Sequence, residues 1–151
     1  MSMSEPLWGL PNPDTHSEFY KDVAIKRLFA WLIDMVFIGL ISAVVVVLTA
    51  FTGLFFLPFL VLCVSLIYRT VAIARHSATP GMRLVSLEFR THRGEKFDTS
   101  LALIHTIAYT VSVSMVLPQV ISIILMLSSS RRQGLTDMFL GTAAVNKAAS
   151  Y

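Results

Sequence analysis

Asp, Glu, Lys and Arg are absent from two long stretches of the chain, residues 35–68 and residues 99–130, and both stretches consist mainly of apolar residues. Uncharged apolar runs of about 18 residues or more are typical of helices that cross a membrane. The charged residues are confined to the chain ends and to the segment between the two stretches. This pattern predicts an all-α integral membrane protein.

The first apolar stretch is too long for one crossing. An unbroken helix from Arg27 to Arg75 would run about 72 Å, against a hydrocarbon core of about 30 Å. Thr52-Gly53 lies near its middle and has turn chemistry. We therefore expect one helix over about residues 23–51 and a second over about residues 55–75, joined as a hairpin.

Basic residues gather at one end of this expected hairpin. They precede its first helix or follow its second, whereas its turn has no charge: Lys21, Lys26, Arg27, Arg75, Arg83, Arg90, Arg93 and Lys96. Loops rich in Lys and Arg stay on the cytoplasmic side, so we expect this end in the cytoplasm. Residues 1–26 hold four acidic residues and no basic n-region before an apolar core, so we expect the first helix to be retained.

The segment over residues 77–98 has a different pattern. Thr79-Pro80-Gly81 has the residues of a type II turn. Val85, Leu87 and Phe89 alternate with polar residues, which predicts a short strand or a β-hairpin with one apolar face. Since isolated hairpins are marginal, we expect it to pair with residues 141–145 near the C-terminus.

The second apolar stretch leaves two alternatives open. As one helix it would span about 48 Å, too long for a simple crossing and too short for two full crossings. A single kinked span would place Arg131 and Arg132 outside, against the charge rule. We favour a hairpin broken at Pro118, with helices over about residues 99–115 and 118–129.

The expected fold therefore has four helical segments, two full spans plus a shorter helical hairpin, with a small cytoplasmic β element and both termini inside. Residues 1–20 form an irregular N-terminal arm, residues 21–147 the membrane domain and residues 148–151 a tail. The lipid bilayer is the expected surrounding, and a homo-oligomer or a larger membrane complex is the expected assembly.

Composition adds to this picture mainly by exclusion. The chain is 55% hydrophobic and 14% charged, with a net charge of +3; soluble domains carry about 25% charged residues. Its basic residues flank apolar stretches, so membrane topology explains them and nucleic acid does not. Cys63 is the single cysteine. Hydrolase, nucleotide-binding and metalloprotease motifs are absent, so we expect no enzyme activity, no cofactor and no metal.

Three separated motifs resemble the RDD family of small integral membrane proteins. They are Arg27-x-x-Ala30-x-x-Ile33-Asp34, Ala78-Thr79-Pro80-Gly81, and Arg132-Gln133-Gly134-Leu135-Thr136-Asp137 leading into Gly141-Thr142. The resemblance covers about residues 20–147. It assigns the family's signature arginine and two aspartates to Arg27, Asp34 and Asp137. Met82 and Thr136 depart from the family pattern, which often has a basic residue and a His there.

The resemblance implies little about function, because the family's biochemical role is largely undetermined, with suggestions that include cation/proton exchange. With the charge pattern, it leads us to expect a multi-pass protein of a bacterial-type inner (plasma) membrane, both termini cytoplasmic.

Asp34 within an apolar helix requires a partner, because a carboxylate at a helix centre costs about 2.5–3.5 kcal/mol on insertion scales. Arg27 lies about 10 Å away along the axis and leans away from Asp34. Matching of depths along the expected helices predicts a buried polar layer of Asp34, Arg69 and His105, and Tyr109 extends the polar stripe of His105. Arg27 is instead expected to meet Asp137.

These residues admit functional and structural interpretations. Asp34, with His105, could exchange protons or monovalent cations, which would require an oligomer because four short helices enclose no pathway. Alternatively, the Asp34–Arg69 pair is structural, Arg27 anchors the topology, and the His105–Tyr109 stripe packs helices. Because of the family resemblance, we favour an oligomeric transporter of monovalent cations or protons; the alternative is a non-transporting accessory or assembly subunit beside a larger membrane complex.

Overall fold

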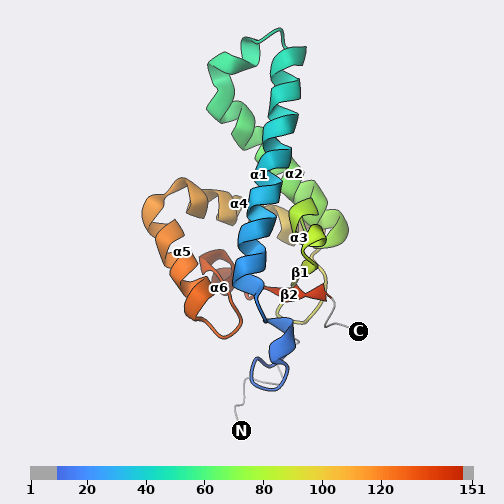
Figure 1. The fold of residues 1–151 in the computed structure, drawn as a ribbon, viewed down its shortest axis with the longest axis vertical. Helices are drawn as coiled ribbons and strands as arrows, with labels where there is room; N and C mark the ends of the chain where they lie inside the picture. The colour runs from blue at the N-terminus through green and yellow to red at the C-terminus, as the bar shows by residue number, and fades with distance from the viewer. Residues whose placement is uncertain (1–9, 148–151) are drawn as a thin grey trace.

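The computed structural model describes residues 10–147; the first nine residues of the expected arm and the expected tail over residues 148–151 lie outside this range. The described part is mostly helical. Two long helices, α1 (Val23–Leu48) and α2 (Leu57–His76), form a hairpin that projects from a broader base (Figure 1). The predicted helical hairpin is therefore present, and the remaining elements gather near its open end.

The turn of this hairpin differs in detail from the prediction. The chain reverses at Ala50 and Phe51, both with positive φ, and continues through a 3-10 turn, η3 (Thr52–Phe56). Pro58 is the second residue of α2. A backbone N–H at this position would have no intrahelical acceptor, so proline costs the helix no hydrogen bond. The helices are therefore slightly shorter at the turn than predicted.

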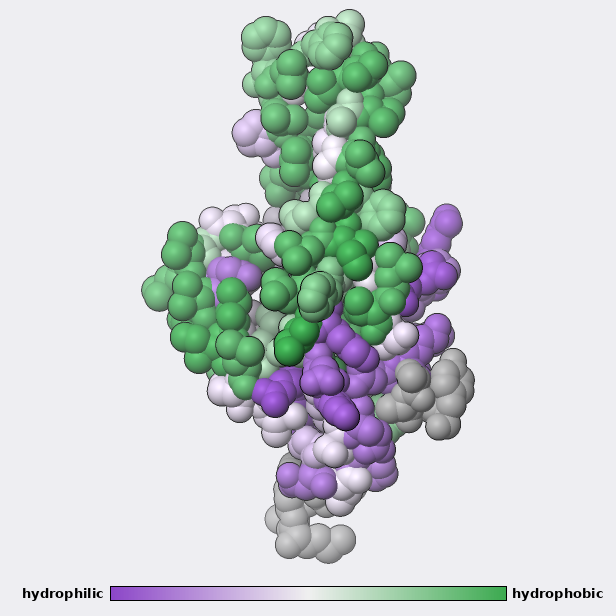
Figure 2. All heavy atoms as spheres, viewed as in Figure 1, coloured by the Kyte–Doolittle hydropathy of each residue, from purple (hydrophilic) through white to green (hydrophobic). Residues whose placement is uncertain are grey.

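Among residues 10–147, two stretches of helix are long and apolar enough to cross a membrane: η2 (Ser17–Phe19) with α1, and η3 with α2. The number rises to three if the next pair, α4 (Thr99–Ser114) and α5 (Val116–Ser128), is counted as one bent span. Figure 2 shows a mostly hydrophobic surface over the hairpin and over α5, whereas hydrophilic residues gather at the base. We call this base the polar end.

The α4–α5 break lies at Met115, not at Pro118 as the sequence suggested. Met115 has an extended conformation, and the two helices are bent by 113°. Pro118 is the third residue of α5, within the first turn, where backbone N–H groups have no intrahelical acceptor. Proline is tolerated there and does not mark the break.

The polar end contains the remaining short elements: α3 (Pro80–Leu84), β1 (Leu87–Arg90), α6 (Leu135–Leu140) and β2 (Ala143–Asn146). The two strands pair antiparallel, with Glu88 opposite Val145. The predicted strand and its partner near the C-terminus are thus both confirmed. The alternating residues Val85, Leu87 and Phe89 pack in the core as predicted, while Glu88 is also buried and bonds to Arg90.

The prediction of a type II turn at Thr79-Pro80-Gly81 is wrong. These residues begin α3: the Thr79 side chain accepts a hydrogen bond from Met82 N at 3.2 Å, and Pro80 is the first helical residue. Proline at the first helical position is as compatible with a helix start as with a turn. A turn follows β1, where Thr91 N donates to Glu95 O at 2.8 Å.

The main hydrophobic core lies at the polar end, where α1, α2, α4 and the sheet meet. Its larger buried members include Val23, Ile73, Leu87, Phe89 and Phe97. Most apolar residues of the long hairpin, by contrast, are exposed on the surface of the chain, as expected for helices solvated by lipid or by other proteins. The tertiary packing that fixes the fold is therefore concentrated next to the charged groups.

A disulfide tests the strand register. Cysteines replacing Glu88 and Val145, with Cys63 replaced by alanine, should crosslink in membranes, because opposite residues of antiparallel strands lie about 4.5–5.5 Å apart, which a disulfide can span. The matched control pairs Glu88→Cys with Ala144→Cys, whose side chain points to the other face. Non-reducing gels give the readout; equal crosslinking in both variants would contradict the register.

Candidate functional site

The first ionic cluster surrounds Asp34, which is 1% exposed in α1. Its Oδ1 accepts hydrogen bonds from the Tyr68 hydroxyl and from the Gly81 backbone N–H, both at 2.8 Å. Its Oδ2 accepts from the Thr79 hydroxyl at 2.6 Å and lies 3.9 Å from Arg69 Nη1. The carboxylate therefore joins α1 to α2 and to the start of α3.

The sequence around Thr79-Pro80-Gly81 explains this geometry. The first backbone N–H groups of a helix have no intrahelical acceptor, and at the start of α3 the Asp34 carboxylate accepts from one of them. Gly81 permits the close approach: a Cβ atom there would lie 2.2 Å from the Ala30 carbonyl oxygen and 2.8 Å from Asp34 Oδ1. The glycine is required by lack of space between α3 and α1.

Arg69 is 5% exposed and contacts two groups. Its guanidinium lies 3.9 Å from the centroid of the Tyr109 ring, and one of its nitrogens forms the long ion pair with Asp34. Stacking of a guanidinium on an aromatic ring is favourable, more so away from water. The Asp34–Arg69 pair and Tyr109 thus lie together, as the expected polar layer requires.

The second ionic cluster surrounds Asp137, in α6, whose side chain is fully buried. Arg27 Nη1 donates to Oδ2 at 2.5 Å, while His105 Nε2 lies 2.9 Å from Oδ1. The Thr142 hydroxyl donates to Oδ1 at 2.9 Å. Desolvation by burial opposes ionisation, but the positive charge of Arg27 and the hydrogen bond from His105 prevail and hold the pKa of Asp137 below its ordinary value.

Two glycines position this cluster. Gly141 ends α6 with a φ of 67°, the left-handed conformation that glycine adopts at helix ends. The chain then turns so that Thr142 faces back to Asp137. Gly134 precedes α6 and packs on α5: a Cβ atom there would lie 2.6 Å from Ser122 Oγ. Gln133 reinforces the turn, because its side chain donates to the Thr142 carbonyl at 2.7 Å.

His105 differs from its sequence-based assignment. It belongs to the Asp137 cluster and does not join Asp34 and Arg69, whereas Tyr109, one helical turn further along α4, reaches Arg69. The rings of Phe89 and Phe97 pack against the imidazole, at centroid distances of 4.5 and 5.4 Å. Depth matching assumed parallel helices, and the bent α4–α5 pair does not follow that geometry.

The expected contact between Arg27 and Asp137 is present, and Arg27 also lies over the Phe89 ring at 5.7 Å. Sequence reasoning missed Thr79, Gly81 and Thr142 as partners of the two aspartates. The resemblance motifs contained all three residues, but motif spacing does not specify which atoms meet.

The chemistry open to these carboxylates is limited. An ionised carboxylate has about four acceptor positions, and hydrogen bonds or ion pairs engage both oxygens of Asp34 and of Asp137. Within residues 10–147, no group of three or more His, Cys, Asp or Glu side chains is arranged to hold a metal ion. The arrangement suits electrostatic attachment of the polar end to the helices.

Replacing Gly81 with alanine should destabilise the fold. The added methyl group cannot fit between α3 and α1, and overpacking of this kind costs about 1–3 kcal/mol. The matched control is Gly39→Ala in α1, where a Cβ would meet no atom within 4 Å. Midpoints of thermal unfolding in detergent should fall for Gly81→Ala and stay level or rise for Gly39→Ala; similar midpoints would contradict the close approach.

The lowered pKa of Asp137 predicts a pH dependence. A carboxyl whose pKa is depressed by folding contributes stability above its unfolded pKa, ordinarily 3.8, and loses that contribution as the pH falls through the lower folded value. The thermal midpoint of the wild-type chain should therefore fall on acidification from about pH 5 towards pH 3, and that of Asp137→Asn should fall less. Asp14→Asn, at an exposed position, should follow the wild type; parallel profiles for all three chains would refute the assignment.

Comparisons with known proteins identify the family. The sequence model of the RDD family matches residues 23–141, most of the chain, and this range includes Arg27, Asp34 and Asp137. Comparison with curated proteins and comparison with solved structures each gave no match. With its apolar helices and its family match, this chain is a membrane protein that belongs to the RDD family.

Proposed function

We propose that the chain is a non-transporting accessory or assembly subunit that packs beside a larger membrane complex, with no catalytic role. Its aspartates hold the fold together and take no part in moving ions. Transport of monovalent cations or protons by an oligomer, through Asp34 and His105, is the rival hypothesis, and the two make opposite demands on the carboxylates.

The burial of both carboxylates among protein donors is the observation that carries this proposal. A site that exchanges a cation or a proton needs an oxygen that can release its partner and reach water. Asp34 and Asp137 are 1% and 0% exposed, and each accepts at least three hydrogen bonds from protein groups. Removal of one partner from a buried ion pair is strongly destabilising. This cost argues against a transport cycle in which either aspartate repeatedly loses its partners.

The exposed apolar surface supports a role in association. Little of the surface of η3 and α2 is covered by the rest of the chain, and Phe55, Phe59 and Ile67 are 85%, 67% and 66% exposed. Helices associate in membranes through close packing of such surfaces. An accessory subunit offers this hairpin to a neighbouring protein while its polar end stays rigid.

The paired strands support a topology. Residues 87–90 and 143–146 form one sheet, so the segment between them must leave and re-enter on the same side of the membrane. We propose two full spans, α1 and α2, plus a re-entrant α4–α5 hairpin, giving four helical segments. The basic residues of the polar end support the proposal that this end and both termini lie in the cytoplasm of a bacterial-type inner membrane.

Reconstitution in liposomes tests the rival directly. The purified chain should give no flux of Na⁺ or K⁺ driven by a pH gradient beyond that of protein-free liposomes. Asp34→Asn should instead lower the thermal midpoint, because the ion pair with Arg69 is lost. A flux that disappears in Asp34→Asn while the thermal midpoint is unchanged would overturn the proposal.

A photo-crosslinkable residue at Phe59 tests for the partner. On irradiation of native membranes it should give a discrete adduct with another protein. Adducts formed only between copies of this chain would instead favour a homo-oligomer and count against the accessory role.

A further inference from the structure

A cavity of about 410 Å³ lies between α1, α4 and α5, next to both ionic clusters. Most of its lining is apolar, and its walls include Ile25, Leu28, Ile123 and Leu127, which are 58%, 56%, 46% and 60% exposed. The walls therefore continue into the exposed apolar surface of α1 and α5. The volume is in the range of sites that hold small ligands, about 300–1,000 Å³.

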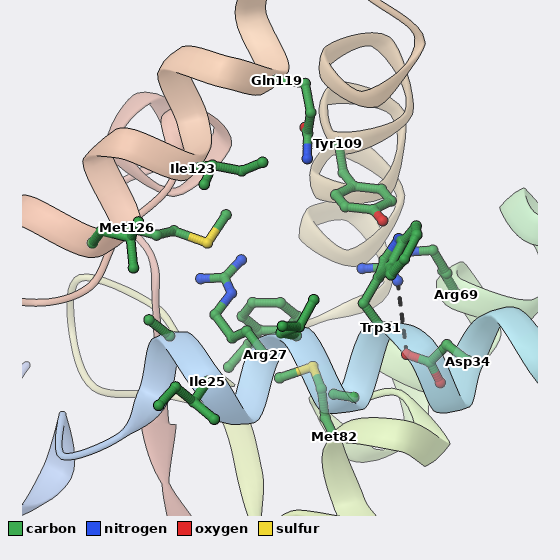
Figure 3. Close-up of a pocket in the computed structure, with 15 residues that line it drawn as sticks. Ile25, Arg27, Trp31, Asp34, Arg69, Met82, Tyr109, Gln119, Ile123 and Met126 are labelled. Carbon is green, nitrogen blue, oxygen red and sulfur yellow. Dashed lines mark ion pairs between the residues drawn. The ribbon is translucent and has the colours of Figure 1, made fainter. Parts of the chain in front are cut away.

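Two arginines border this apolar space. Figure 3 shows the Arg27 guanidinium projecting from α1 towards Ile123 and Met126 of α5, while Arg69 lies on the opposite side beside Trp31 and Tyr109. Gln119 of α5 adds a side-chain amide to the lining. Guanidinium groups at the border of an apolar cavity are typical of sites for amphiphiles with an acidic head.

Arg69 has hydrogen-bonding capacity that the described residues leave unused. It is 5% exposed, its Nε has no hydrogen-bond partner, and its nearest approach to Asp34 is an ion pair at 3.9 Å, beyond hydrogen-bond distance. Arg27 uses Nη1 to bind Asp137, and a guanidinium carries five N–H donors. Buried charged donors without acceptors are costly, so the site favours a ligand that brings acceptor oxygens.

The sign of the ligand's charge follows from the same contacts. The Asp34 carboxylate also borders the cavity, but Tyr68, Thr79 and Gly81 already donate to its oxygens. The unused groups are therefore donors, which suit an anion. Arginine binds phosphate with a planar fork of donors, and basic pockets between membrane helices bind acidic lipid headgroups.

We propose that this cavity binds an acidic phospholipid, with its phosphate held by Arg69, with the positive charge of Arg27 on the other side of the cavity, and with its acyl chains lying along the exposed faces of α1 and α5. Arg27 lines the cavity and binds Asp137 of the polar end. The headgroup region of the membrane is expected at this end, whose hydrophilic surface Figure 2 shows. The apolar approach to the cavity favours a lipid over free phosphate. Binding would add acceptors for Arg69 without opening either aspartate cluster.

Binding to the full chain tests this proposal. Phosphatidylglycerol added to the purified protein in detergent should raise the thermal midpoint more than phosphatidylcholine with the same acyl chains, and inorganic phosphate at equal concentration should have no effect. Arg69→Gln should weaken phosphatidylglycerol binding about tenfold or more, because a charge-assisted hydrogen bond contributes about 1.5–3 kcal/mol.

A second variant is needed because Arg69→Gln also removes the ion pair with Asp34. Ile123→Trp fills the cavity from α5 and leaves every ionic and hydrogen-bonding group of the two clusters in place, so it should abolish the preference for phosphatidylglycerol while the protein stays folded. Its matched control is Ile124→Trp, at an exposed position of the same helix outside the cavity lining, which should bind like the wild type.

Three results would overturn the proposal. Equal stabilisation by phosphatidylcholine would show that only apolar fit matters. Stabilisation by inorganic phosphate alone would show a site for a free anion. Equal phosphatidylglycerol binding by Ile123→Trp and Ile124→Trp would place any lipid elsewhere on the surface. None of these results depends on whether the chain transports ions.

Discussion

The structure depends on one constraint: an ionised side chain inside an apolar helix must be surrounded by donors. Asp34 meets it with a backbone N–H from the start of α3, two hydroxyl groups and a nearby arginine. Because these donors come from α2 and from the segment after it, their convergence fixes where the chain must turn after leaving the membrane. The carboxylate that opposes insertion of α1 thereby specifies the position of the polar end.

The same constraint applies to Asp137, but here the acid and the basic groups exchange places. Here the acid belongs to the short helix α6, and the membrane helices supply Arg27 and His105. The two clusters attach α3 and α6 to the first long helix at positions seven residues apart, Arg27 and Asp34. Two attachment points on one helix restrict rotation of the polar end in a way that a single ion pair cannot.

Much of this arrangement could be predicted because it follows from periodicity and charge. The charge-free stretches predicted the long helices, and the alternation of apolar and polar residues predicted β1. The contact of Arg27 with Asp137 followed from the outward lean of side chains near a helix start. The position of His105 could not be predicted, since it depends on the angle between α4 and the other helices. Likewise, Thr79-Pro80-Gly81 fits either a turn or a helix start, and the choice depends on Asp34, which is distant in sequence.

The pairing of β1 with β2 has a consequence for biosynthesis. Translation delivers Arg27 and His105 to the membrane well before Asp137, Thr142 and the second strand exist. Until the last segment leaves the ribosome, these cationic and imidazole groups lack their acid, and the first strand has an open edge. The polar end therefore forms late. The nascent chain is least stable in the interval after the α1–α2 hairpin has entered the membrane and before the second strand has been made.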